Sequence, residues 1–553
     1  MEVAMFFREK RCGSYRYLQI VENTWDGGKT RQRVIGTLGR VEHLQDEGKL
    51  DALLESGARF SRNILVLNAH REGKLEELGK WRTGGPRVFE RVWAETGCAA
   101  VIRELAGERK FKFDVERAVF TTVLHRLLDP GSDRACEKWK EGYEIVGANG
   151  LELQHFYRAM GWLGEPLEAQ EEPAPFSPRC VKDEAEERLF RRRRDLFTTV
   201  DMLFFDTTSI YFEGEGGETL GEYGHSKDHR PDLKQMVVGA LLDNDGRPVC
   251  SEIWPGNTAD VKTLVPVARR MRERFGVEQA CLVADRGMIS RETIAWLEDQ
   301  KAPWPYILGA RMRRQKEVSE DVLSRAGRYR EVHPERTNTK DPSPLKVKEV
   351  EVEGRRYVVC VNAEQARRDA AVREAILGSL EAQLKQGPKS LVGNKGYRRY
   401  LKAKGASFEI DQSKVEEEAR YDGKWVLRTN TALATDAVAL KYKQLWTVED
   451  LFRRVKSVLS TRPVYHKCDE TIRGHVFCSF LALVLMEELQ RRIAAKGDVL
   501  EWADVVRDLD NLEDVELVQD AKRFRVRVGL SGCCGKVFQA AGVAIPPMVR
   551  QLS

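Results

Sequence analysis

The feature that most constrains the fold of this chain is a series of short apolar segments between residues 202 and 312. Five of these segments have the length and composition of buried strands, and we expect strands at 202–206, 235–242, 249–254, 280–284 and 305–308. Apolar residues at helical spacing predict one helix before the fourth strand and another after it, opening at Ser290. The expected order is therefore β-β-β-α-β-α-β.

This order is that of the ribonuclease H fold, which carries metal-dependent phosphoryl transfer on nucleic acids. The order alone does not decide the function, because mixed sheets of this kind recur among unrelated proteins. We expect an α/β chain with a ribonuclease H-like catalytic core, a β-rich insertion, and an N-terminal β-hairpin and helical region.

Turn residues and changes of pattern divide the rest of the chain. Strands at 15–22 and 31–37 are predicted to form a hairpin that turns at Asp26-Gly27-Gly28. Asp114 is predicted to cap a helix that ends at Asp129-Pro130-Gly131. The expected units are a hairpin region at 1–85, a helical region at 86–200, a catalytic core at 201–312 and 441–495, an insertion at 313–440, and a C-terminal appendage at 496–553.

Two aspartates end strands that should be neighbours. Asp206 closes the first predicted strand and Asp285 follows the fourth. In a sheet of this order these two strands lie side by side, so both carboxylates would sit at one edge. Close carboxylates repel each other unless a cation or a proton compensates, and hard divalent cations with oxygen ligands are suited to this. Each aspartate taken alone could equally be a turn residue.

A later helix offers a third acid. Tyr442, Glu449 and Lys456 are spaced by seven residues, which brings them to nearly the same face of one helix, and Arg453 joins that face. The other face carries the apolar positions 445, 448, 452, 455 and 459. An acid flanked by cations and an aromatic suits a metal ligand bordered by phosphate contacts. The alternative is an ordinary surface ion pair between Glu449 and Arg453.

The segments that carry these residues also resemble a known family. The stretch from Tyr442 to Lys456 is similar to the Tyr-x2-Arg-x3-Glu-x6-Lys signature of family-four insertion-sequence transposases of the DDE type and their close relatives. Phe-Phe-Asp-Thr-Thr at 204–208 and Val-Ala-Asp-Arg-Gly-Met at 283–288 resemble the segments around that group's two aspartates. Further resemblance lies at 224–228, 462–466 and 472–475, and in the opening hairpin. The sequence departs from the signature at Leu445, where the family has an arginine that helps to hold the transposon end.

The resemblance implies a set of roles and partners. Asp206, Asp285 and Glu449 would be the catalytic residues and the ligands of two Mg²⁺ (or Mn²⁺) ions, and Tyr442, Arg453 and Lys456 would bind DNA, Arg453 in part for the missing arginine. The partners would be double-stranded DNA, as terminal inverted repeats and target, held by a homodimer that cuts and pastes through a hairpin intermediate. The helical region at 86–200 is then either the part that binds DNA ends or a scaffold.

The composition is consistent with a protein of this family but does not require one. The net charge is only +5, so bulk charge does not mark a polyanion-binding protein, although basic clusters occur locally. Eleven cysteines without metal-binding spacing, and an N-terminus without the layout of a signal peptide, predict a cytoplasmic protein with no membrane segment. The resemblance implies that this protein is bacterial and nucleoid-associated. Two other functions stay open: a metal-dependent nuclease that never joins DNA, and a non-catalytic DNA-binding relic.

Overall fold

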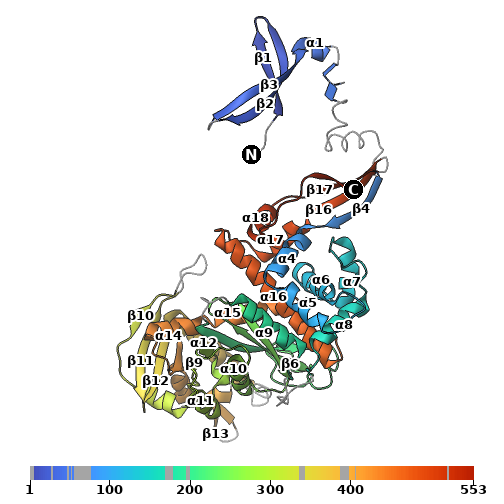
Figure 1. Cartoon of the computed structure of the whole chain (residues 1–553). Helices are drawn as coiled ribbons and strands as arrows, with labels where there is room; N and C mark the ends of the chain where they lie inside the picture. Colours follow the sequence, from blue (N-terminus) through green and yellow to red (C-terminus); the bar gives the residue numbers. More distant parts are fainter. Residues whose placement is uncertain are drawn as a thin grey trace. The chain divides into compact units, whose positions relative to one another are not determined.

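A computed structural model gives the fold of the chain (Figure 1). It describes residues 5–26, 29–46, 49–50, 53–54, 76–167, 178–194, 200–299, 301–334, 343–386, 398–404, 407–519 and 522–552. The chain divides into two compact units, which we describe separately. Unit 1 comprises residues 1–84, 503–538 and 544–553, and unit 2 comprises residues 85–502 and 539–543.

A mixed sheet forms the centre of unit 2. Its first part consists of β5 (Met202–Tyr211), β6 (Gln235–Leu242), β7 (Pro248–Pro255), β8 (Cys281–Ala284) and β9 (Tyr306–Gly309). These strands lie in the order β9-β8-β5-β6-β7, with β5 parallel to β8 and β8 parallel to β9. The five strands predicted between 202 and 312 all form, and the predicted mixed α/β class is confirmed. The first and fourth predicted strands are neighbours, as expected.

Helices cover the sheet on the side of a large apolar core. Odd-numbered residues of β5, Leu203 and Phe205, pack in this core with α10 (Leu264–Glu273) and α11 (Arg291–Leu297). Because side chains alternate along a strand, Asp206 points to the opposite face. The helix α15 (Trp446–Ser457) packs against β5 and β6, and its buried side is apolar.

The segment 313–440, which we expected to be a β-rich insertion, extends the core sheet. Its strands in this sheet are β10 (Arg330–Val332), β11 (Leu345–Val352), β12 (Arg355–Asn362) and β15 (Lys424–Thr429). The junction is the antiparallel pairing of β15 with β9, where Leu427 lies opposite Gly309. The strands β5–β12 and β15 thus form one sheet of nine strands.

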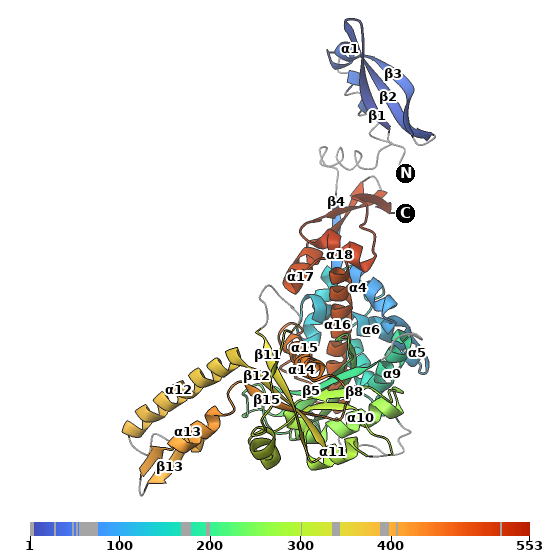
Figure 2. The ribbon, with the colours of Figure 1, turned by 90° about the vertical axis from the view of Figure 1, so that its left-hand side faces the viewer.

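An arm projects from the extended part of the sheet (Figure 2). It contains α12 (Ala363–Lys385), α13 (Gln412–Ala419) and the hairpin of β13 (Leu401–Lys404) and β14 (Ser407–Ile410). The arm has a small core of its own, made by buried residues of these elements: Leu380, Tyr400, Leu401 and Val415.

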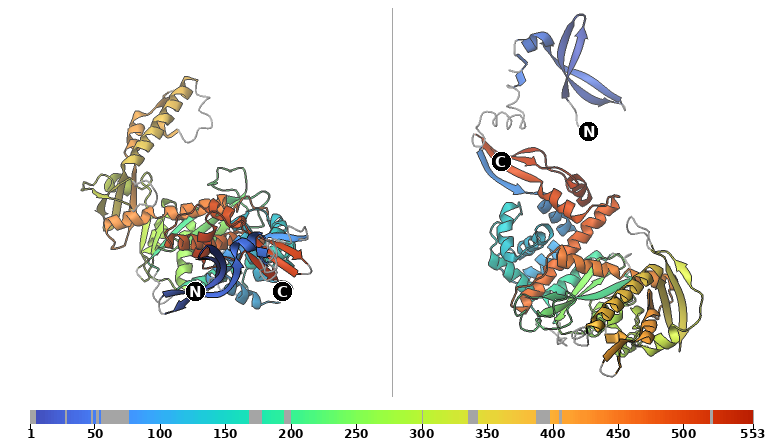
Figure 3. Two further views of the ribbon diagram at one scale, coloured as in Figure 1. Left: turned by 90° about the horizontal axis from the view of Figure 1, so that it is seen from above. Right: turned by 180° about the vertical axis from the view of Figure 1, so that it is seen from behind.

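Helices of the N-terminal half of unit 2 pack around the long helix α16 (Asp469–Ala495), which runs beside α6 (Val115–Leu128) and α8 (Leu153–Leu163) (Figure 3). Asp114 caps α6 as predicted, accepting a hydrogen bond from the backbone N–H of Arg117. The other helices of this region are α4 (Gly84–Glu95), α5 (Cys98–Gly107), α7 (Asp133–Trp139) and α9 (Val181–Arg193).

Unit 1 contains two sheets. In the first, β1 (Met5–Cys12) pairs with β2 (Tyr15–Asp26), and β2 forms the predicted hairpin with β3 (Lys29–Arg40). The predicted turn residues Gly27 and Gly28 lie outside the described residues. α1 (Val41–Asp46) follows. In the second sheet β4 (Glu76–Arg82) pairs with β16 (Glu513–Gln519), which continues to β17 (Lys522–Val528) and β18 (Val549–Leu552). No local pattern in the sequence predicts this pairing across the length of the chain. α17 (Trp502–Asp510) and α18 (Cys534–Ala541) complete the C-terminal elements.

Two observations on the described residues relate to the predictions made from composition, which concerned membrane segments and cysteines. None of the helices among them combines the length and apolar character needed to cross a membrane. All eleven cysteines are free thiols, and eight are buried.

Candidate active site

The register of two parallel strands brings Asp206 and Asp285 together. Phe205 of β5 lies opposite Ala284 of β8, so the next residue of each strand is an aspartate at the same level of the sheet. One detail differs from the prediction. Asp206 lies in the middle of β5, because the strand continues to Tyr211 by antiparallel pairing with β6. It is the pairing with β8 that ends just before Asp206.

Glu449 lies on α15, which crosses the face of the sheet to which Asp206 points. It is exposed, whereas the positions 445, 448, 452, 455 and 459 that we assigned to the apolar stripe are all buried. Tyr442 does not share this helix. It belongs to α14 (Thr435–Lys443), and the chain tightens between the two helices, where the N–H of Leu445 donates to the carbonyl of Tyr442. The prediction of one continuous helical face through Tyr442 was therefore wrong.

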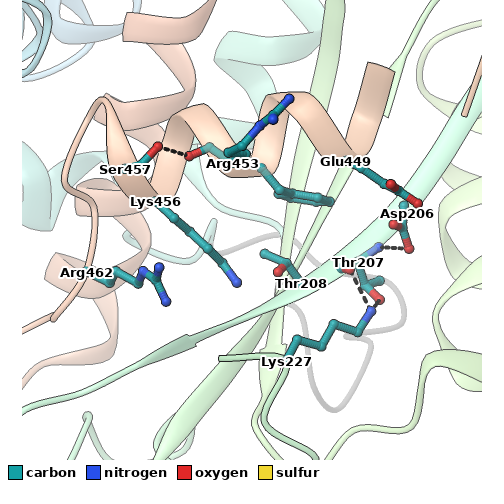
Figure 4. Close-up of a pocket in the computed structure, with 10 residues that line it drawn as sticks. Asp206, Thr207, Thr208, Lys227, Glu449, Arg453, Lys456, Ser457 and Arg462 are labelled. Atoms are coloured by element: carbon teal, nitrogen blue, oxygen red, sulfur yellow. Dashed lines mark hydrogen bonds between the residues drawn. The ribbon is translucent and has the colours of Figure 1, made fainter. Parts of the chain in front are cut away.

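Asp206 and Glu449 line one open pocket in unit 2, with a volume of about 370 Å³ (Figure 4). Its other lining residues are mostly polar or cationic: Thr207, Thr208, Lys227, Phe452, Arg453, Lys456, Ser457 and Arg462. Burial, opposed by Lys227 and assisted by the charges of Asp285 and Glu449, raises the pKa of Asp206 to about 6. The charges of Asp285 and Glu449 thus both act on Asp206.

Tyr442 contacts one of the three acids, Asp285. Its hydroxyl donates a hydrogen bond to Oδ1 of Asp285 at 2.8 Å. Burial, followed by the negative charge of Asp285, raises the pKa of the phenol well above its usual value. The hydroxyl therefore keeps its proton and is directed at a carboxylate.

The two cations predicted to bind DNA have different surroundings. Lys456 is 10% exposed and pairs at 2.8 Å with Oδ1 of Asp228, which also pairs with Arg462. Burial lowers the pKa of Lys456 below its usual value. Arg453 is 72% exposed at the rim of the pocket and pairs with Asp450 of its own helix. Of these two cations, only Arg453 therefore presents its charge to solvent.

Lys227 and Asp260 join the site although the sequence analysis assigned them no role. The ammonium group of Lys227 donates to the carbonyl of Thr207 at 2.7 Å and to its hydroxyl at 3.0 Å, and lies 3.4 Å from Asp260. The Thr207 hydroxyl in turn donates to Asp260 at 2.8 Å. Lys227 lies in the motif at 224–228, which is the one signal that could have pointed to it.

Comparison with known proteins identifies the family of the chain. Residues 201–485, which contain all three acids, match the transposase DDE domain, and residues 7–70 match the N-terminal domain of IS1634 family transposases. The chain belongs to the DDE transposase family. It is a DNA transposase of an insertion sequence, as the resemblance implied. The finer assignment to the family-four group remains a prediction.

Two further comparisons complete the picture of the transposase. No match was found among curated proteins. Among solved structures, the cryo-EM structure of a piggyBac transposase synaptic complex with hairpin DNA is similar over 77% of this chain and 77% of that chain, with 11% sequence identity and a TM-score of 0.35. Similarity at this level supports no conclusion about this chain.

The DDE domain implies dependence on a divalent metal, and the acids of the transposase fit such an ion. Their donors are carboxylate oxygens, which hard divalent cations prefer, and the charges of Asp285 and Glu449 add to burial in raising the pKa of Asp206. The three carboxylates do not approach one another as a group within 4.8 Å. Ligation by all three acids therefore requires a closer approach of Glu449 or of the strand ends.

Another group in the transposase has metal-ligand spacing but is already satisfied. Among the described residues, ligand atoms of Asp133, His466 and His475 lie within 4.8 Å of one another. Arg126 donates to Nδ1 of His475 at 2.9 Å, so a guanidinium ion already occupies that lone pair. His466 contacts Asp133 at 3.2 Å. We interpret the cluster as a buried hydrogen-bond network.

Proposed function

We propose that this transposase cuts and joins transposon-end DNA by two-metal-ion phosphoryl transfer at Asp206, Asp285 and Glu449. The observation that carries the proposal is the register that sets Asp206 beside Asp285 on the sheet face crossed by the helix of Glu449. We further propose that β5–β9 with α10, α11 and α15 are a ribonuclease H-like core, and that 313–440 is an insertion that extends its sheet.

In this proposal the residues have distinct tasks. Asp206, Asp285 and Glu449 hold Mg²⁺ or Mn²⁺, which when bound supplies Lewis acidity for activating a water or a DNA 3′-hydroxyl and for stabilising the leaving oxygen. Lys227 fixes the strand next to Asp206 through Thr207 and offsets part of the negative charge. Arg453, at the rim, neutralises a phosphate of the bound end, and so takes up part of the function of the arginine that Leu445 replaces.

The contacts of the helical region favour a scaffold over a DNA-end-binding role. Arginines of this region are held by acids of the same region: Arg103 by Glu116 at 3.0 Å, and Arg117 by Glu90 at 2.8 Å. Arg109 pairs with Glu165 at 2.5 Å. Their charge is therefore largely neutralised within the protein.

The sheet of β1–β3 is a better candidate for a DNA contact. Strand register places Lys10, Tyr17 and Arg40 in one row across a face of this sheet, and Arg8 lies on the same face two residues before Lys10. Arg8 donates to Gln19 and Gln32, and Arg40 donates to Tyr17, so these hydrogen-bond partners are neutral. We propose that this face binds the end DNA, with one copy of the chain on each end of the element.

A strand-transfer assay with a pre-cut transposon end tests the proposed function. In Mg²⁺ the wild-type chain should join the 3′-hydroxyl of this end to a target plasmid, and Asp285→Asn should abolish joining. Cleavage without joining would identify a metal-dependent nuclease. Binding with neither reaction in Mg²⁺ or Mn²⁺ would identify a non-catalytic relic.

A further inference from the structure

The side-chain hydroxyl of Tyr442 contacts a carboxylate and does not lie in open solvent. Its hydroxyl donates to Oδ1 of Asp285 at 2.8 Å. Tyr442 lies in the last turn of α14, directly before the helix that carries Glu449. The hydrogen bond therefore links the strand end of one acid to the start of the helix of another.

Gly309 leaves the space that this hydrogen bond needs. Ala284 of β8 lies opposite Leu308 of β9, so Gly309 comes next to Asp285 in the sheet. A Cβ atom at position 309 would lie 2.5 Å from the hydroxyl oxygen of Tyr442 and 2.9 Å from the backbone nitrogen of Arg286. Both distances are shorter than real Cβ contacts. Glycine is therefore required here by space, since its φ lies outside the positive range.

The side chain of Arg311 also holds the turn that follows Asp285. Arg311 donates from Nε to the carbonyl of Arg286 at 2.9 Å and from Nη2 to the carbonyl of Gly287 at 2.7 Å. With the backbone fixed in this way, rotation of its side chain is the main freedom left to Asp285. The hydroxyl of Tyr442 restricts this rotation.

We propose that Tyr442 is a positioning residue that orients the carboxylate of Asp285 for a divalent cation, and that Gly309 is glycine in order to admit the phenol. This inference rests on the proposed function, in which Asp285 is a metal ligand. The phenol occupies one side of Oδ1 and holds the carboxylate in one rotamer, as hydrogen-bonded partners of metal ligands do. It replaces the phosphate contact that the sequence suggested, because the hydroxyl already donates its single proton.

Two variants disrupt the same hydrogen bond in different ways. Tyr442→Phe removes the hydroxyl, and Gly309→Ala displaces it while keeping the phenol. In the full-length chain, binding of Mn²⁺ is measured from the loss of the free-ion signal in electron paramagnetic resonance, without DNA. Each variant should weaken Mn²⁺ binding about tenfold or more, the usual effect of losing such a partner, and raise the Mg²⁺ concentration needed for cleavage. Affinity for end DNA in metal-free buffer, and its dependence on salt, should not change.

Controls separate this role from damage to the fold. Tyr306→Phe removes another buried phenol, which donates to Glu298 rather than to Asp285, and should leave Mn²⁺ binding unchanged. The double variant Tyr442→Phe with Gly309→Ala should bind Mn²⁺ no more weakly than Tyr442→Phe alone, because both changes remove one interaction. If Gly309→Ala does not fold, Tyr442→Phe with its Tyr306→Phe control still decides.

The outcomes distinguish this inference from the proposed function. Unchanged Mn²⁺ binding by Tyr442→Phe, together with weaker and less salt-dependent DNA binding, would overturn the inference and restore the phosphate contact. Unchanged Mn²⁺ binding and cleavage by Asp285→Asn would instead overturn the proposed function, whatever Tyr442 does.

Discussion

The ion pair of Lys456 with Asp228 gives the most informative single substitution, Lys456→Met. Lys456 is 10% exposed and Asp228 is 5% exposed, and Oδ2 of Asp228 has no hydrogen-bond partner within the described residues. The carboxylate therefore depends on the two cations at Oδ1, Lys456 at 2.8 Å and Arg462 at 2.5 Å. Removing one partner of a buried pair usually costs about 3–5 kcal/mol. Since Arg462 remains, we expect a loss of about 2–3 kcal/mol in the free energy of unfolding.

Urea denaturation followed by tryptophan fluorescence measures this loss, and the salt dependence of end-DNA binding is measured beside it. The salt slope should remain nearly unchanged, because the charge of Lys456 is already neutralised. Adding Asp228→Asn to Lys456→Met should recover part of the loss, since no buried charge is then left with too few partners. Stability within about 0.5 kcal/mol of wild type, with a salt slope lower by about one, would refute the reasoning and make Lys456 the DNA contact that the sequence predicted.

Three further predictions concern other parts of the transposase. Burial raises the pKa of Glu186 to about 8, above its value in the unfolded chain, so its contribution to stability is present below about pH 4.5 and is lost as the pH rises towards 8. Glu186→Gln should flatten the fall of stability between pH 5 and 8 in urea titrations, and equal slopes in both proteins would contradict this. Arg453→Ala should lower the salt slope of end binding by about one without loss of stability, because Arg453 is exposed; an unchanged slope would remove it from the DNA path. Gly474→Ala should lower the melting temperature, because its Cβ would lie 2.0 Å from the carbonyl oxygen of Met160, and unchanged melting would show that α8 and α16 can separate freely.

Local patterns in the sequence predicted the elements of the core. Apolar runs and turn residues sufficed for β5–β9. A local turn signal also stands between β11 and β12, at Glu353-Gly354, where both residues have positive φ. Pairing between distant segments leaves no such signal. For this reason the sequence did not reveal that β15 extends the sheet beside β9, or that β4 pairs with β16 near the other end of the chain.

The site shows the same division. The strand order was enough to predict that Asp206 and Asp285 are neighbours, because it depends on local runs alone. The roles of Tyr442 and Lys456 depend on single contacts across more than 150 residues, with Asp285 and Asp228, and no spacing predicts those. The seven-residue spacing also misled us at Tyr442, since the chain tightens by a few backbone hydrogen bonds at Leu445 and starts a new helix.

Glu449→Gln tests the central claim most directly, because it keeps the size of the side chain and removes the charge that would hold a cation. The measurement is single-turnover cleavage of transposon-end DNA in Mg²⁺, together with binding of the same DNA in metal-free buffer. The account predicts that cleavage is lost while end binding is largely retained. Cleavage at the wild-type rate would contradict the account, since another acid would then have to complete the site.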